Sequence, residues 1–131
     1  MRRAEQLQKF KSDGKTVSPE RLLVMLYERL GRDLADAASA ITDGDAERRH
    51  SALVHAQEIV EELAYAVNPD VWESGEGLVA LYQYLLELLV KANINSDRRA
   101  LTEATSIVAD LTEAWRQAYL EVASRAGTVA S

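Results

Sequence analysis

Apolar residues recur at intervals of three and four along four segments of the chain, which is the pattern of amphipathic helices. The segment 78–93 has the widest apolar surface of the four. Its seam, spaced three and four, consists of Leu78, Leu81, Leu85, Leu88 and Ala92. Its apolar flank adds Val79, Tyr82, Leu86, Leu89 and Val90. The apolar arc then spans roughly 240°, whereas a surface helix usually shows little more than about 100°. We expect this helix either to be buried almost all round or to keep surface for a partner, and a small bundle favours the partner.

Capping residues and helix breakers set the limits of the four helices. Ser18 and Pro19 are typical of a helix start, and Gly44 lies in the turn that ends the first helix. The second helix, which Asp45 can cap, is expected over about 46–66, before Asn68-Pro69. The third is the 78–93 segment. The fourth, capped by Ser96 or Asp97, has a regular seam of Leu101, Ala104, Val108, Leu111, Trp115, Ala118 and Val122.

Four amphipathic helices with short connections predict an all-α fold, an antiparallel (up-down-up-down) four-helix bundle. We expect an N-terminal arm over 1–17, in which a short extra helix would be marginal, and the bundle itself over 18–123. The small and polar residues of 124–131 predict a frayed C-terminal tail.

Composition excludes several classes of function. The 131 residues carry a formal net charge of -6, which argues against nucleic acid as the main ligand. No stretch offers the 18 or so uninterrupted apolar residues of a membrane span, so we expect no membrane insertion. The chain has no cysteine, which fits a cytoplasmic protein.

The sequence offers no candidate for catalysis. Glu47 and His50 have the Glu-x-x-His spacing of di-iron bundles, but His55 has no carboxylate three residues before it and the helix seams are apolar. We therefore interpret His50 as a partly exposed side chain and expect no metal and no cofactor. Because no nucleophile, base and acid occur in a recognisable set, we expect a protein that is not an enzyme.

Tyrosine and tryptophan provide a better indication of function, because both are common interface anchors as well as ordinary core residues. Tyr82 and Tyr84 lie roughly 200° apart on a helix. They cannot both point into one core.

Four motifs, in order along about 10–119, resemble those of the flagellin-specific export chaperones, the FliS family. The first-helix sequence Ser18-Pro19-Glu20-x-Leu22-Leu23-x-Met25-Leu26-Tyr27-Glu28 resembles the family's SPxxLxxMLYDG, although Glu28-Arg29 replaces its Asp-Gly. Leu81-Tyr82-x-Tyr84-Leu85 resembles its LYxYM. The remaining two resemblances are Lys91-Ala92-Asn93-Ile94-x-x-Asp97 to EANxxxD and Glu113-Ala114-Trp115-Arg116-Gln117-Ala118 to DAWKEA.

The resemblance implies a cytoplasmic helical bundle that binds the C-terminal segment of flagellin, prevents premature polymerisation and delivers flagellin to the flagellar type III export gate. It also implies an N-terminal arm that can cover the binding groove, with Leu7 and Phe10 as the lid. The expected groove consists of Leu23, Tyr27, Tyr82, Leu86, Leu89, Asn93 and Trp115.

Two alternatives stay open at this point. Each groove residue could instead be an ordinary core residue. The chain could also be a self-associating structural bundle without a cargo role, and a homodimer in the absence of cargo would bury the same apolar flank. If Leu89 lies in the groove, Leu89→Asp should weaken cargo binding and leave helicity largely intact.

Overall fold

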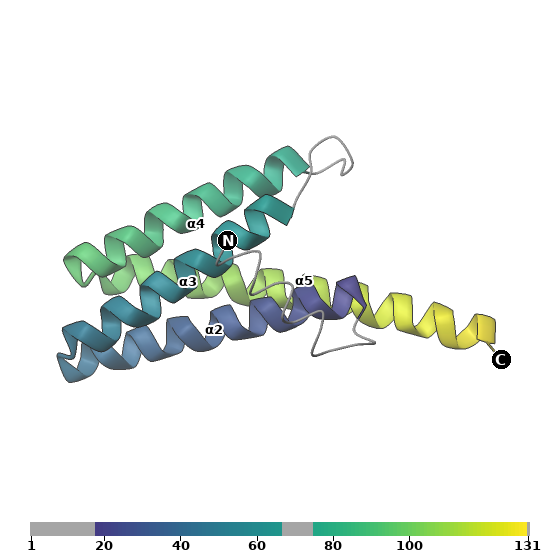
Figure 1. Cartoon of the computed structure of the whole chain (residues 1–131), viewed down its shortest axis with the longest axis horizontal. Coiled ribbons are helices and arrows are strands. Elements are labelled where there is room, and N and C mark those ends of the chain that lie inside the picture. Colours follow the sequence, from purple (N-terminus) through teal and green to yellow (C-terminus); the bar gives the residue numbers. More distant parts are fainter. Residues whose placement is uncertain (1–17, 67–74, 131) are drawn as a thin grey trace.

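The computed structural model of the protein describes residues 18–66 and 75–130. Four helices occupy these ranges: α2 (Pro19–Asp43), α3 (Ala46–Ala66), α4 (Gly75–Asn95) and α5 (Arg98–Ala130). Each helix runs opposite to the one before it, α2 packs against α3 and α5, and α4 packs against the same two helices (Figure 1). The predicted antiparallel four-helix bundle is confirmed, whereas the predicted N-terminal arm lies outside the described residues.

Polar side chains cap the helices where the sequence predicted them. The Ser18 hydroxyl accepts a hydrogen bond from the Arg21 amide at 3.1 Å, and the Asp45 carboxylate accepts one from the Arg48 amide at 3.0 Å. Asp97 caps α5 in the same way. These bonds satisfy amide groups that have no partner inside the helix. The helix ends are therefore fixed by local chemistry, and the turns place the four helices side by side.

The bundle encloses one hydrophobic core that all four helices supply. Its fully buried side chains include Tyr27, Leu30, Leu34, Leu53, Val60, Leu63, Tyr82, Leu85 and Leu89. The Tyr27 and Tyr82 hydroxyls are 2.5 Å apart, and the Trp115 ring stacks on Tyr27 at a centroid distance of 6.4 Å. This buried hydrogen bond joins α2 to α4 across the diagonal of the bundle.

Helix α5 continues to Ala130 and so includes most of the segment 124–131, for which the sequence predicts a frayed tail. Its last turns project beyond the other helices (Figure 1), and Leu120 and Val122 are about half exposed there. The sequence between 98 and 130 has no proline to stop the helix, and an ion pair between Glu121 and Arg125, one turn apart, supports it. Helix α5 therefore continues beyond the last residues that contact the core.

By length and composition alone, residues Gly77–Asn95 of α4 would suffice to cross a membrane, with a mean hydropathy of 1.2. Gln83, Glu87 and Lys91 interrupt the apolar sequence. The side chains of Tyr82 and Leu89 are buried within the bundle. A core helix of a bundle has this composition too, because it contacts neighbours on two sides.

Candidate partner-binding surface

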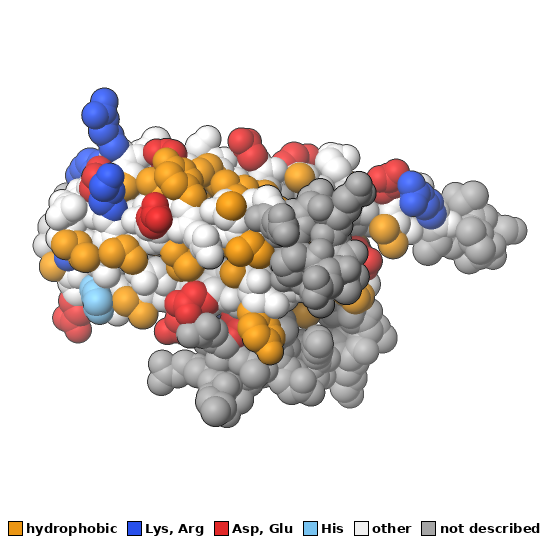
Figure 2. Space-filling model, turned by 90° about the horizontal axis from the view of Figure 1, so that it is seen from above, with side chains coloured by type: hydrophobic (Ala, Val, Ile, Leu, Met, Phe, Trp, Pro, Cys, Tyr) orange, Lys and Arg blue, Asp and Glu red, His pale blue; other side chains and the backbone are white. Residues whose placement is uncertain are grey.

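Helix α4 leaves three large apolar side chains exposed on the outside of the bundle. Ile94 is 74% exposed, Val90 41% and Tyr84 40%. The face of the protein that is seen from the α4 side shows hydrophobic side chains in rows along the bundle, with most of its visible basic side chains at one end (Figure 2). Helix α4 therefore keeps exposed apolar surface, of which Val90 alone belongs to the flank that the helical pattern predicted.

A groove of about 780 Å³ lies between this part of α4 and the beginning of α5. The nearly buried side chains of Leu88 and Ala100 line it from the two helices. Charged residues of both signs line it as well: Glu87, Lys91, Asp97, Arg99 and Glu103. The groove thus combines an apolar base with charged groups at its edges, which is typical of surfaces that bind another helix or an extended segment.

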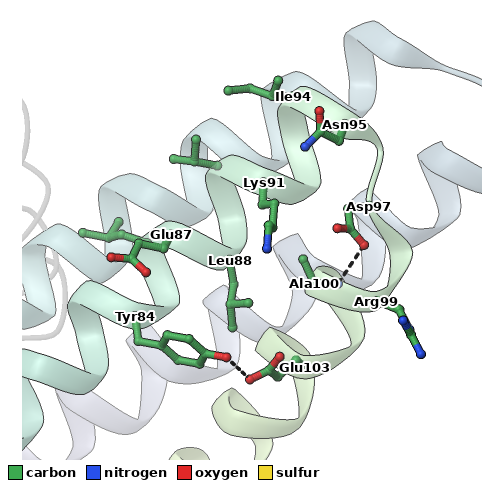
Figure 3. Close-up of a pocket in the computed structure, with 12 residues that line it drawn as sticks. Tyr84, Glu87, Leu88, Lys91, Ile94, Asn95, Asp97, Arg99, Ala100 and Glu103 are labelled. Atoms are coloured by element: carbon green, nitrogen blue, oxygen red, sulfur yellow. Dashed lines mark hydrogen bonds between the residues drawn. The ribbon is translucent and has the colours of Figure 1, made fainter.

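Tyr84 reaches from α4 to α5 along this groove. Its ring points toward α5, and its hydroxyl donates a hydrogen bond to the Glu103 carboxylate, whereas Ile94 points away from α5 (Figure 3). Because the hydrogen bond to Glu103 favours the protonated phenol, the pKa of Tyr84 is raised. The ring of Tyr84 is thereby held in one direction while remaining partly open to solvent.

The structure does not bring the seven predicted groove residues to one surface. Tyr27, Tyr82 and Leu89 are at most 1% exposed and belong to the core. Four others are half-buried: Leu23, Leu86, Asn93 and Trp115. Of the seven, only Leu86 lines the groove between α4 and α5. The flank of α4 that we expected to be exposed is therefore mostly turned inward.

The physical reason is that α4 has two neighbours. Leu85 and Leu88 alone would define one narrow seam, but packing against both α3 and α5 needs a wider apolar arc, and Tyr82 and Leu89 supply it. Sequence reasoning placed Tyr84 on the opposite flank from Tyr82 correctly. It missed Ile94, which lies just beyond the predicted helix 78–93 but belongs to α4 and follows Val90 one helical turn later.

Polar contacts fix the end of α4 that bears Asn93. The Asn93 amide donates to His50 Nδ1 at 3.0 Å, and Arg49 donates to Asn93 Oδ1 at 3.5 Å and to the Ser96 hydroxyl at 3.0 Å. The Asn93 side chain therefore connects α4 to α3 through hydrogen bonds. Leu7 and Phe10, the predicted lid, lie outside the described residues.

Both histidines have protein partners rather than the surroundings of a metal ligand. His55 Nδ1 lies 2.5 Å from the Asp33 carboxylate, and His50 bonds to Asn93. Burial raises the pKa of Asp33, and the hydrogen bond to His55 opposes that rise. Within residues 18–66 and 75–130, no group of three or more acidic, histidine or cysteine side chains is placed to hold a metal ion.

Comparison with known proteins finds similarity to the FliS family of flagellar proteins. Residues 1–122 match the family model described as flagellar protein FliS. Over 103 residues the chain is 37% identical to the flagellar secretion chaperone FliS of Bacillus subtilis, covering 79% of this chain and 77% of the relative. The corresponding protein of Campylobacter jejuni is 32% identical over 105 residues (78% and 80%), and that of Salmonella typhimurium 29% over 105 residues (78% and 77%).

Proposed function

Because the chain belongs to the FliS family of flagellar proteins, it is a cytoplasmic flagellar secretion chaperone and not an enzyme, and we propose that the exposed surface of α4 is where it holds flagellin. In this role the protein binds the C-terminal segment of flagellin and prevents premature polymerisation. It then delivers flagellin to the export gate of the flagellar type III secretion apparatus. In this role the protein acts by binding its cargo and catalyses no reaction.

The observation that carries this proposal is the exposure of Tyr84, Val90 and Ile94 on one helix, beside the groove between α4 and α5. Contiguous exposed apolar side chains next to a groove mark an interaction site. Burying Ile94, which is three-quarters exposed, would contribute on the order of 1–2 kcal/mol. A segment that folds as it binds loses conformational entropy, so several such contacts along α4 are needed.

The remaining predicted groove residues take two roles in this proposal. Leu86 contributes to the groove itself, and the exposed parts of Leu23, Asn93 and Trp115 extend the contact beyond it. The buried residues Tyr27, Tyr82 and Leu89 support α4 from beneath.

Calorimetric titration with a peptide of the flagellin C-terminal segment tests the proposal. The wild-type chain should form a 1:1 complex, and Ile94→Asp should weaken it at least about tenfold because a carboxylate replaces an apolar contact. Tyr65→Asp is the matched control, since Tyr65 is 88% exposed but lies on α3. If the wild type and Ile94→Asp bound the peptide equally well, α4 would not be the binding site. If the wild type formed no complex at all, the proposed binding of flagellin would be contradicted.

A second candidate, a self-associating bundle, is favoured by one observation: Tyr84, Val90 and Ile94 of α4 are exposed and would be buried if a second copy covered this helix. Sedimentation separates the two candidates. A dimer that forms through α4 and ignores flagellin would support a purely structural role, whereas dissociation by flagellin would support the chaperone role.

A further inference from the structure

The charged side chains that line the groove between α4 and α5 are separated by sign along its length. Glu87 of α4 and Glu103 of α5 lie toward the middle of the bundle and form an acidic end. Lys91 and Arg99 lie about one helical turn farther along, toward the turn that joins the two helices, and form a basic end (Figure 3). The two helices are antiparallel, so each end receives one residue from α4 and one from α5.

Three of these four charges are available to a bound segment. Glu87, Lys91 and Arg99 are exposed, and within residues 18–66 and 75–130 none of them forms an ion pair. Glu87 and Lys91 are four residues apart on α4, a spacing at which opposite charges on a helix can pair. Because they do not pair here, a segment that enters the groove can meet them without breaking an existing ion pair.

The other charged residues of the lining leave the two ends different in sign. Glu103 accepts the hydrogen bond of the Tyr84 hydroxyl, which is a neutral donor and does not cancel the charge of the carboxylate. Asp97 lies at the basic end, where its carboxylate caps α5 by accepting the Ala100 amide at 3.1 Å. Among the described lining residues, the basic end therefore has two bases and one acid, whereas the acidic end has two acids and no base.

The apolar part of the groove gives a bound segment no comparable direction. Leu88 and Ala100 form its base and are at most 6% exposed. Burial of apolar surface is non-directional, so an amphipathic segment can lie on this base in either direction. Reversing the segment exchanges the charges that meet at the two ends, and the charged side chains thus distinguish two directions that the apolar base does not.

We propose that the two charged ends of the groove set the direction in which the C-terminal segment of flagellin lies on α4, with a basic side chain of the segment at the acidic end and an acidic side chain at the basic end. The reverse direction would bring like charges together at both ends. The matching segment carries a base and an acid roughly 6 Å apart, which is four residues in a helix or two in an extended chain. The identity of the segment rests on the proposed function, whereas the directing charges belong to the groove itself.

Two synthetic amphipathic peptides test the direction. They have the same composition and differ only in the exchange of one lysine and one glutamate that are four residues apart. Each is mixed with the full chain carrying a photoreactive residue in place of Asn95, which is exposed and lines the groove beyond its basic end. Mass spectrometry identifies the captured half. The half with the glutamate should be captured at least about fivefold more in both peptides, because each exposed ion pair changes an equilibrium by up to about fivefold.

Exchanging the two charges of α4 removes the difference between the ends. In Glu87→Lys/Lys91→Glu each end has a base opposite an acid across the groove, so the capture ratio should fall below about twofold or reverse. Glu121→Arg/Arg125→Glu is the matched control, since it exchanges an exposed pair with the same spacing on α5 outside the groove and should keep the wild-type ratio. Salt at about 1 M should lower the wild-type ratio, because the Debye length falls to about 3 Å. Circular dichroism of each variant verifies that the fold is retained.

Capture of both peptides through the same end, whatever their charges, would overturn the proposal, and so would a ratio that the exchange on α4 leaves unchanged. A wild type that captures neither peptide at about 100 μM would overturn it as well. Competition with the flagellin peptide then separates this inference from the proposed function. Displacement of the directed peptides by flagellin supports both. Directed capture that flagellin does not displace leaves the directing charges in place and overturns the binding of flagellin in this groove, whereas undirected capture that flagellin displaces overturns the direction alone.

Discussion

Leu89 and Ile94 lie on the same helix, but replacing them should change the free energy of unfolding by very different amounts. Leu89 is 1% exposed and belongs to the core, whereas Ile94 is 74% exposed. Truncating a buried leucine to alanine removes its contacts and leaves a cavity, which costs about 2–5 kcal/mol. An exposed apolar side chain loses little on truncation, within about 0.5 kcal/mol. Leu89→Ala and Ile94→Ala are therefore a matched pair.

The free energy of unfolding of a domain of this size is on the order of 5–15 kcal/mol, so Leu89→Ala should remove a large fraction of it. Leu89→Asp should be worse, because it also places an unpaired carboxylate in the core. The sequence had led us to expect that this variant would lose cargo binding and stay helical. Its burial predicts instead that it unfolds, so that any loss of binding is a consequence of unfolding.

Urea unfolding followed by circular dichroism measures the difference. With a denaturant slope of about 1–3 kcal/mol per molar, a loss of about 3 kcal/mol moves the midpoint of Leu89→Ala down by at least about 1 M. Ile94→Ala should keep the wild-type midpoint. If the free energies of unfolding of Leu89→Ala and the wild type differed by less than about 0.5 kcal/mol, Leu89 would behave as a surface residue. That result would contradict the burial of this flank of α4.

Three further predictions concern the buried tyrosine pair and the first turn. Tyr82→Phe should destabilise the protein by about 1–3 kcal/mol in urea unfolding, because the buried Tyr27 hydroxyl loses the Tyr82 oxygen 2.5 Å away. Tyr27 also has a side-chain hydrogen bond with Trp115, so Tyr27→Phe should cost stability as well. The double variant Tyr27→Phe/Tyr82→Phe should nevertheless lose less than the sum of the two single losses, and additive losses would contradict the pairing. Burial raises the pKa of both tyrosines, so the folded state retains their protons when the unfolded chain releases them. Below about pH 10 these two groups should therefore leave the free energy of unfolding unchanged. Above about pH 10 it should fall by up to about 1.4 kcal/mol per pH unit for each tyrosine. If the double phenylalanine variant showed an equally steep fall, the pH dependence would not come from Tyr27 and Tyr82. Gly44→Ala should cost about 1–2 kcal/mol, since Gly44 has a φ of 69° although nothing lies within 4 Å of an added Cβ; an unchanged midpoint in thermal unfolding would show that the turn relaxes freely.

Local sequence signals were sufficient for the helices and their order. Ser18, Asp45 and Asp97 each accept a backbone hydrogen bond at a helix start, and their side-chain chemistry makes that outcome independent of tertiary packing. Short connections then leave an antiparallel arrangement as the simple solution. The fold could thus be predicted because its determinants lie within a few residues of one another.

The exposed side of α4 could not be predicted in the same way. A wheel shows that α4 has more apolar surface than one seam needs, but the choice of which edge stays outside depends on how α3 and α5 are placed around it. Leu89 and Val90 are adjacent in sequence, and tertiary packing buries the first and exposes the second. The length of α5 escaped prediction for a related reason, because a helix can continue past its last core contact.

Cross-linking from a photoreactive residue at position 94 measures the central claim most directly, since Ile94 is the most exposed apolar side chain of α4 in the described structure. The variant would be mixed with full-length flagellin in solution and the cross-linked segment identified by mass spectrometry. The C-terminal segment of flagellin should be captured from position 94, and a photoreactive residue at the even more exposed Tyr65 position on α3 should capture far less. Equal capture from both positions, or none from position 94 in a complex that still forms, would contradict the assignment of the α4 surface as the cargo site.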